Sequence, residues 1–83
     1  MKSGDLVRVA GACYDAPINH HDAGAAIRHY VGIIEEGSLG VVVGVTKVFY
    51  TARTYTDWYQ VLTGGRAVWL NTLNARSVCD EAG

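Results

Sequence analysis

Short stretches of the chain alternate between apolar and polar residues, which is the period of a β-strand with one buried face. The stretch 6–9 places two valines on one face and Arg8 on the other. The run 41–46 is rich in valine, a β-branched residue that favours strands over helices. Gly44 interrupts this run, which indicates a bulge or bend. The pattern therefore predicts a chain built mainly of strands.

The clearest local pattern is a hairpin in the second half of the chain. Two apolar-rich stretches, 58–62 and 67–70, flank the segment 63–66, which contains Gly64 and Gly65. Adjacent glycines suit a tight turn because both central residues of such a turn adopt a positive φ. We therefore predict two short antiparallel strands joined through Gly64-Gly65.

Turn-forming residues divide the remaining strand signals. A strand over 31–36 precedes a glycine-containing break at 37–40. Near the end of the chain, a single 3₁₀ turn over 71–75 leads into a last strand over 76–79. These divisions keep every predicted strand short.

Two long loops separate the strands. The first covers about 10–30 and contains glycine, proline, asparagine and histidine, with one helical turn possible over 23–29. The second covers 47–57 and is rich in aromatic residues. Loops of this length in a small domain are usually functional or disordered, so both are candidate binding segments.

The order of these elements predicts the fold. A short strand, a long loop, a strand, a second loop, a tight hairpin, one helical turn and a final short strand follow one another, as in SH3-like proteins. We therefore predict an all-β fold, with a single SH3-like β-barrel domain over residues 1–83. The barrel should have about five antiparallel strands, a long first loop (about 10–30) and the tight Gly64-Gly65 hairpin.

Three segments resemble small SH3-like barrel proteins encoded by tailed bacteriophages. Residues 2–9 read Lys-Ser-Gly-Asp-Leu-Val-Arg-Val, 37–42 read Gly-Ser-Leu-Gly-Val-Val, and 59–69 contain Tyr-Gln-Val-Leu before Gly64 and a closing Trp69. The resemblance implies a non-enzymatic structural or accessory protein located in the virion. A Gly-Asp-Leu-Val opening also starts photosynthetic accessory subunits and ribosomal KOW-type modules. The alternative is therefore a KOW/SH3-like adaptor that binds RNA or a host regulatory protein in the host cytoplasm.

A second resemblance is to the signalling SH3 domains that bind proline-rich peptides. Residues 12–15 resemble their Ala-Leu-Tyr-Asp motif, and Trp58-Tyr59 resembles their paired aromatic residues. The segment 70–73, however, lacks the proline and tyrosine that complete their aromatic groove. Because polyproline recognition needs that groove, this function is disfavoured.

Composition and charge narrow the classes of partner. The 83 residues carry seven basic and eight acidic side chains, for a formal charge of −1. Proteins that bind phosphate backbones usually have a basic excess, so nucleic acid is a disfavoured partner. No apolar run approaches the ~20 residues of a membrane-spanning helix, and the start lacks the pattern of a secretory signal. We expect no membrane association and no export.

The residues capable of metal binding or catalysis form no recognised motif. His20, His21, Asp22 and His29 lack zinc-finger spacing, and no nucleophile elbow accompanies Cys13. A disulfide between Cys13 and Cys79 is the less favoured state of these thiols, because nothing indicates an oxidising compartment and buried thiols act as small hydrophobic groups. We predict no enzyme activity, cofactor or metal.

Aromatic residues are numerous for so small an interior. The chain has two tryptophans, five tyrosines and one phenylalanine, and a small barrel seats only some of them. Exposed aromatic rings are typical of protein interfaces. The predicted interface consists of the second-loop residues Phe49, Tyr50, Arg53 and Tyr55, with Arg28 and Arg66 at its rim. The partners would be other virion proteins or copies of the chain itself; alternatively, the rings cap the core.

Overall fold

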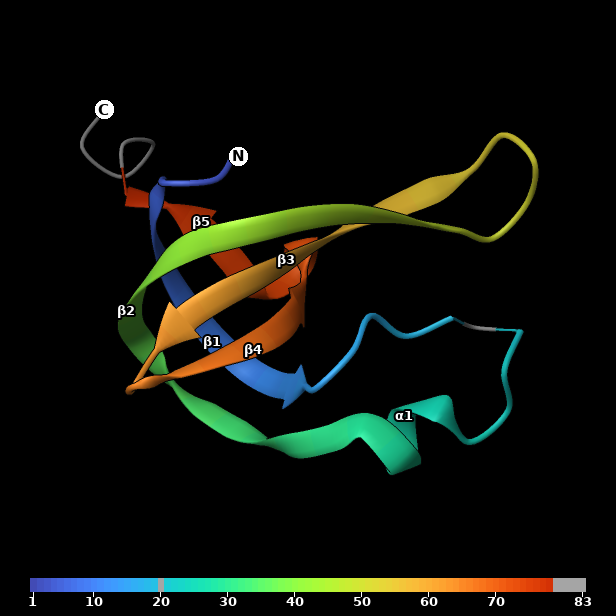
Figure 1. Cartoon of the computed structure of the whole chain (residues 1–83), viewed down its shortest axis with the longest axis horizontal. Helices are drawn as coiled ribbons and strands as arrows, with labels where there is room; N and C mark the ends of the chain where they lie inside the picture. The colour runs from blue at the N-terminus through green and yellow to red at the C-terminus, as the bar shows by residue number, and fades with distance from the viewer. Residues whose placement is uncertain (20, 79–83) are drawn as a thin grey trace.

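The computed structural model describes residues 1–19 and 21–78, and its regular structure consists mainly of β-strands. In chain order (Figure 1), the elements are β1 Leu6–Tyr14, α1 Ala25–His29, β2 Tyr30–Phe49, β3 Tyr55–Thr63, β4 Arg66–Asn71, the 3₁₀ helix η1 Thr72–Asn74 and β5 Ala75–Ser77. The predicted all-β class with five antiparallel strands is therefore confirmed.

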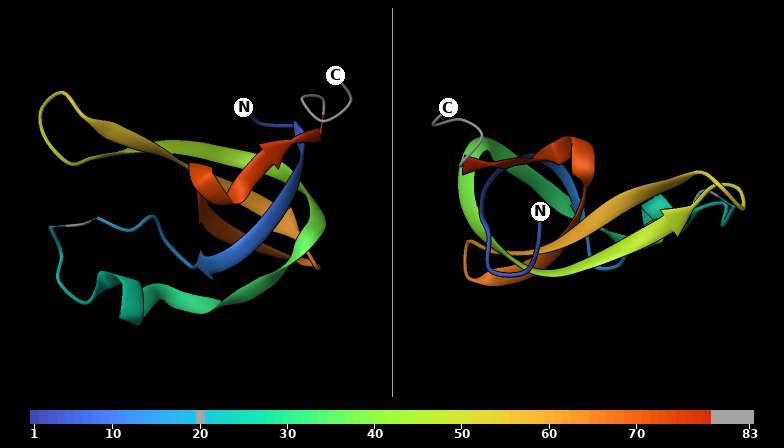
Figure 2. Two further views of the ribbon diagram at one scale, coloured as in Figure 1. Left: turned by 180° about the vertical axis from the view of Figure 1, so that it is seen from behind. Right: turned by 90° about the horizontal axis from the view of Figure 1, so that it is seen from above.

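The strands form one antiparallel sheet in the order β2-β3-β4-β1-β5, with an additional pairing between β2 and β1. β1 lies along the first half of β2, from Leu6 opposite Val41 to Tyr14 opposite Tyr30. The second half of β2 pairs with β3, and β3 pairs with β4. A single pair joins β4 to β1, and β5 lies beside the start of β1. The pairings thus return to the strand from which they started (Figure 2).

β2 passes from one neighbouring strand to the other at Gly40 and Val41. Val41 pairs with Leu6 of β1 and also with Leu62 of β3. Gly40 is buried at this bend, and a Cβ atom there would run into Val61 Cγ1 and lie 3.0 Å from the carbonyl oxygen of Leu62. The close approach of β3 therefore requires glycine at position 40.

The predicted break at 37–40 is wrong, because β2 is continuous from Tyr30 to Phe49. Gly37 has a φ of +88° and lies where the pairing with β1 shifts register. A glycine in this conformation absorbs extra residues as a bulge without ending the strand. The irregularity predicted at Gly44 is confirmed, since the register with β3 shifts between Val42 and Gly44.

The first loop is shorter than the predicted 10–30. β1 continues to Tyr14, so the described loop residues before α1 are 15–19 and 21–24, and α1 confirms the predicted helical turn. Gly11, with a φ of +90°, lies at a register shift that lets β1 continue past it. The small residues at 10–12 lack a hydrophobic alternation, which is why the pattern did not indicate this part of the strand.

Of the two hairpin turns, the one between β2 and β3 is shorter than predicted, and the one between β3 and β4 is as predicted. The second loop is limited to 50–54, because β2 and β3 pair as far as Phe49 opposite Tyr55, and so the predicted loop 47–57 is too long. The turn at Gly64 and Gly65 has φ values of +59° and +80°, which confirms the predicted hairpin.

The end of the described chain follows the predicted order of a 3₁₀ turn and a short strand. The Asn71 side chain accepts a hydrogen bond of 3.0 Å from the Leu73 amide and thereby caps η1. β5 covers Ala75–Ser77, so it starts one residue before the predicted strand 76–79. Cys79 lies outside the described residues, whereas Cys13 is buried and its Sγ donates to the Gly32 carbonyl oxygen.

Two apolar clusters stabilise the sheet. The main cluster consists of Val7, Val9, Cys13, Val42, Tyr59, Val61, Val68, Leu70 and Ala75. The second cluster consists of Ile18, Ala25 and Trp58, with Tyr14, Val48 and Trp69 packed against them. Because Trp58 and Tyr59 are neighbours on β3, they point to opposite faces of the sheet and belong to different clusters. The second cluster therefore attaches the first loop and α1 to β3.

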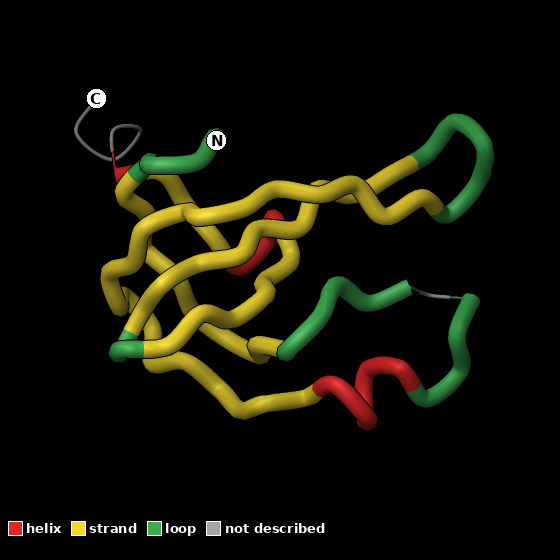
Figure 3. The backbone as a smooth tube through the Cα atoms, viewed as in Figure 1, coloured by secondary structure: helices red, strands yellow, loops and turns green. Residues whose placement is uncertain are grey.

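An arm extends from the sheet, and we define it as residues 15–19, 21–29 and 45–58. It contains the first loop, α1 and the far end of the β2–β3 hairpin. Both segments project to the same side of the molecule (Figures 1 and 3), and the longest dimension of the chain is 36 Å. The arm carries most of the residues that the sequence assigned to binding.

Candidate interaction surfaces

Trp58 is the residue that attaches the first loop to the sheet. Its side chain is 3% exposed and packs with Ile18 and Ala25. Its ring meets that of Tyr14 edge to face, with 5.7 Å between ring centroids. The indole Nε1 is buried and has no hydrogen-bond partner in the described structure. The contact is therefore apolar packing, which fixes the position of the loop without a polar anchor at this ring.

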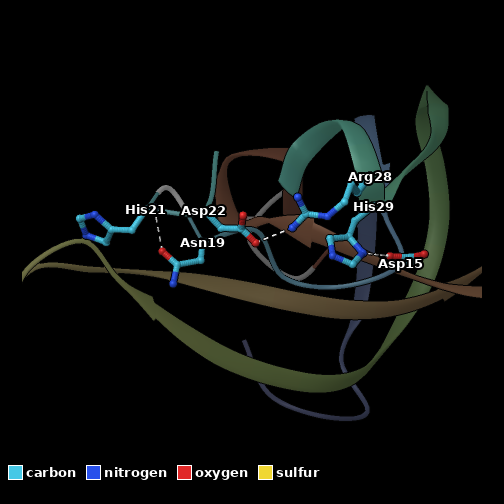
Figure 4. A network of polar contacts seen from close by, with 6 residues as sticks. All are labelled: Asp15, Asn19, His21, Asp22, Arg28 and His29. Carbon is cyan, nitrogen blue, oxygen red and sulfur yellow. Dashed lines mark hydrogen bonds and ion pairs between the residues drawn. The ribbon is translucent and has the colours of Figure 1, made fainter. Parts of the chain in front are cut away.

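Polar contacts then order the loop internally (Figure 4). Asp15 Oδ1 lies 2.6 Å from His29 Nδ1, and Arg28 donates to Asp22 over 2.5 Å. These two pairs connect the start and middle of the loop to α1. All four side chains are partly exposed, and exposed pairs contribute little to stability. Their role is to define the path of the loop.

The two projecting segments are also joined at their ends. The Nε2 atom of His21 lies 2.7 Å from the carbonyl oxygen of Tyr50, at the start of the turn of the β2–β3 hairpin. The backbone amide of His21 in turn donates to Asn19 Oδ1 over 2.9 Å. The arm is thus one connected unit, because packing joins its base and a hydrogen bond joins its tip.

The histidines considered for metal binding occupy separate positions. His21 contacts the hairpin turn and His29 contacts Asp15, while His20 lies outside the described residues. Among residues 1–19 and 21–78, no three His, Cys, Asp or Glu side chains gather as metal ligands would. His21, Asp22 and His29 each make a separate contact within the arm.

Phe49 and Tyr55 form the most prominent aromatic group of the arm. They are direct partners across β2 and β3, and their ring centroids are 5.4 Å apart. Phe49 is 49% exposed and Tyr55 is 46% exposed. Lys47 places its Nζ atom 4.4 Å from the centroid of the Tyr55 ring. The structure therefore presents two rings and a cation on one exposed face of the hairpin, together with exposed Val45.

Tyr50 differs from its predicted role as an exposed interface residue. It is half buried, and its hydroxyl accepts a hydrogen bond of 2.5 Å from Thr56 Oγ1. The hydrogen bond holds the phenol against the hairpin, so this ring serves the arm's own structure. Among these three rings, Tyr50 is partly buried and belongs to neither apolar cluster, whereas Phe49 and Tyr55 are exposed.

The three predicted arginines are not brought together. Arg53 lies in the hairpin turn near the aromatic pair, and Arg28 lies on α1 paired with Asp22. Arg66 begins β4 directly after the Gly64-Gly65 turn, at the opposite end of the molecule (Figure 1). All three are exposed. Only Arg53 therefore lies on the hairpin that carries Phe49 and Tyr55.

The structure has a second exposed apolar surface, across β1, β2 and β3, that the sequence did not predict. Leu6, Val41 and Leu62 are consecutive cross-strand partners on β1, β2 and β3, and all three are exposed. Leu39 is exposed two residues before Val41. The run of three valines at 41–43 indicates such a surface. A strand that is apolar at every position has apolar residues on both faces, so the face that does not point into the core is apolar as well. We refer to Leu6, Leu39, Val41 and Leu62 as the apolar row.

No helix in the described part of the chain has the length and apolar character needed to cross a membrane. Comparison with known proteins gives no match to any family model, curated protein or solved structure.

Proposed function

We propose that the sheet is an SH3-like barrel. The circuit of pairings from β1 through β2, β3 and β4 back to β1 supports this assignment. The long bent strand β2, shared between β1 and β3, and the 3₁₀ turn before β5 are further features of such barrels. A small sheet that wraps in this way leaves few unpaired strand edges.

We further propose that the chain is a non-enzymatic structural or accessory protein of a tailed bacteriophage and a component of the virion. The exposed Phe49–Tyr55 pair is the observation that carries the docking role. Aromatic side chains contribute strongly to interfaces because they bury a large area for few rotatable bonds. Their cross-strand contact, and Lys47 over Tyr55, hold the rings in place before a partner arrives. The partner is another virion protein or a second copy of the chain.

One observation favours the adaptor function as the second candidate. Lys47 and Arg53 lie on the same hairpin as the two exposed rings, and interleaved cations and aromatic rings suit stacked single-stranded bases. A salt titration separates the two functions, because binding to RNA phosphates weakens steeply between low and high salt while apolar docking does not.

Alanine at both Phe49 and Tyr55 should reduce binding to phage particles. The wild-type chain should sediment with purified particles, and the double variant should bind at least about 30-fold more weakly, as for removal of a ~2 kcal/mol interface anchor. The melting temperature should fall by only a few degrees, because both rings are half exposed. Quantitative immunoblotting of gradient fractions measures the first effect and thermal denaturation the second.

Leu73→Ala provides the matched control, because Leu73 is 89% exposed on η1, outside the arm. This variant should bind particles as the wild type does. If the wild-type chain is absent from particles, the virion assignment is wrong. If the Phe49/Tyr55 double variant binds normally, docking does not use the arm.

A further inference from the structure

One edge of the first half of β2 has no strand beside it in the described structure. β1 occupies the other edge from Tyr30 to Val41, and β3 begins to pair with β2 only at Val41. In Figure 1 this half of β2 forms the lower margin of the sheet. Backbone groups on such an edge can pair with a strand from another chain.

The edge is open and apolar at its centre. Ile33 is 75% exposed, and Ile33 and Ile34 line a hollow of about 250 Å³. Thr63, Arg66 and Val68 of the β3–β4 hairpin line the same hollow. A strand added beside β2 would therefore place alternate side chains next to this hollow.

The charges on either side of the edge have opposite signs. Arg28 lies two residues before β2, whereas Glu35 and Glu36 follow the apolar centre, and all three are exposed. If a second copy of this strand paired antiparallel with the first, the basic end of each strand would lie beside the acidic end of the other. Antiparallel pairing around Gly32 places Arg28 of one copy toward Glu36 of the other and Val31 opposite Ile33. A parallel copy, or a uniformly basic or acidic peptide, would bring like charges together at one end.

We propose that the chain forms a two-fold dimer in which residues 30–34 of β2 pair antiparallel with the same residues of a second copy. Arg28 takes part without giving up its contact with Asp22, because a guanidinium carries five N–H donors. The pairing extends the sheet across two molecules and covers Ile33 at the centre of the interface. It does not use the aromatic pair of the arm, so the proposal does not depend on arm docking.

Ile33→Lys tests the centre of the interface. The two-fold axis brings the two substituted side chains close together, so like-charge repulsion should raise the dimer dissociation constant at least about tenfold. Sedimentation velocity over a concentration series gives this constant. Leu73→Lys adds the same charge at a site on η1 that is even more exposed than Ile33, and it should leave the dimer unchanged. A wild-type chain that stays monomeric throughout, or equal effects of both variants, would overturn the proposal.

A charge exchange tests the antiparallel arrangement itself. Arg28→Glu and Glu36→Arg should each weaken the dimer, because each places like charges together at both ends of the paired strands. An equimolar mixture of the two variants should regain the wild-type association, since every pair across the interface is again of opposite charge. A mixture that associates no better than the separate variants would contradict this arrangement.

Two further variants test whether the dimer depends on the Arg28–Asp22 contact within one chain or on the aromatic pair of the arm. Asp22→Asn removes the charge that pairs with Arg28 within one chain, but leaves Arg28 itself in place. It should therefore not weaken the dimer. The Phe49/Tyr55 double alanine variant should also dimerise normally. If it dimerises but no longer binds particles, self-association and arm docking are separate functions; if it fails to dimerise, the β2 edge is not the interface.

Discussion

Replacing Gly40 with alanine should lower the free energy of unfolding by about 3 kcal/mol, the upper end of the usual cost of overpacking a core. The new methyl group would run into Val61 Cγ1 and approach the backbone of Leu62. Val61 is fully buried in the main cluster, and the backbone of β3 is fixed by its pairing with β2. Neither neighbour can move without disturbing the core. Equilibrium urea denaturation measures the loss.

Gly32→Ala is the matched control for Gly40→Ala. Gly32 also lies on β2 and has no positive φ, but an added Cβ atom would meet nothing within 4 Å. Measured on dilute protein, its stability should stay within about 1 kcal/mol of the wild type, with a gain possible because alanine restricts the unfolded chain. Equal losses in the two variants would show that the close approach of β3 is not what requires glycine at position 40.

Replacing Trp58 with alanine should lower the free energy of unfolding by about 3–5 kcal/mol, the range for removing a large buried aromatic side chain. The loss should be accompanied by release of the first loop, since Ile18 and Ala25 pack on this ring. Trypsin provides the second measurement, because Arg28 lies exposed on α1, and this segment can unfold into the extended conformation that the protease binds once the loop leaves the sheet. Cleavage after Arg28 should therefore accelerate relative to cleavage after Arg66, which lies in the distant β4.

Trp58→Phe should lower the free energy of unfolding by much less, about 1–2 kcal/mol. Phenylalanine keeps most of the apolar contact, and it removes an indole N–H that is buried without a partner in the described structure. An unsatisfied buried donor costs about 1–3 kcal/mol, which offsets part of the lost packing. If phenylalanine is as destabilising as alanine, the indole nitrogen makes a stabilising contact and the account of the second cluster as purely apolar packing is wrong.

Local sequence signals were sufficient to predict the parts of the fold that depend on a few neighbouring residues. Gly64 and Gly65 form the turn that their positive φ values permit, and η1 follows Asn71, whose side chain caps it. The strand over 41–46 was predictable from its valines, and the bulge beside Gly44 from the interrupting glycine. In each case, the residues that determine the structure are adjacent in the chain.

The rest depends on contacts between residues far apart in the sequence. β1 extends to Tyr14 because it pairs with Tyr30, across the whole first loop. Trp58 is buried because Ile18, forty positions earlier, folds onto it. No local pattern indicates which segment covers a given ring, so the ordered arm could not be derived from composition or spacing.

The candidate site was also predictable only where it depends on residues that are close together in the sequence. Aromatic content identified the second loop, and Phe49 and Tyr55 are indeed exposed. Their direct pairing, and the contact of Tyr50 with Thr56, depend on where the hairpin turns, and the predicted loop 47–57 was too long to locate that turn. The apolar row is assembled from three strands, and only their register shows that Leu6, Val41 and Leu62 are neighbours.

The pairing of β5 with β1 has a consequence for the order in which the chain folds. Val7 lies opposite Ser77, so this contact closes a loop that contains almost the whole chain. Contacts between distant residues form slowly because the entropy of loop closure must be overcome first. We expect the β2–β3 and β3–β4 hairpins to assemble early and the two terminal strands to join last. Until that step, the valines of β1 remain open to water, and the nascent chain is then most prone to aggregate.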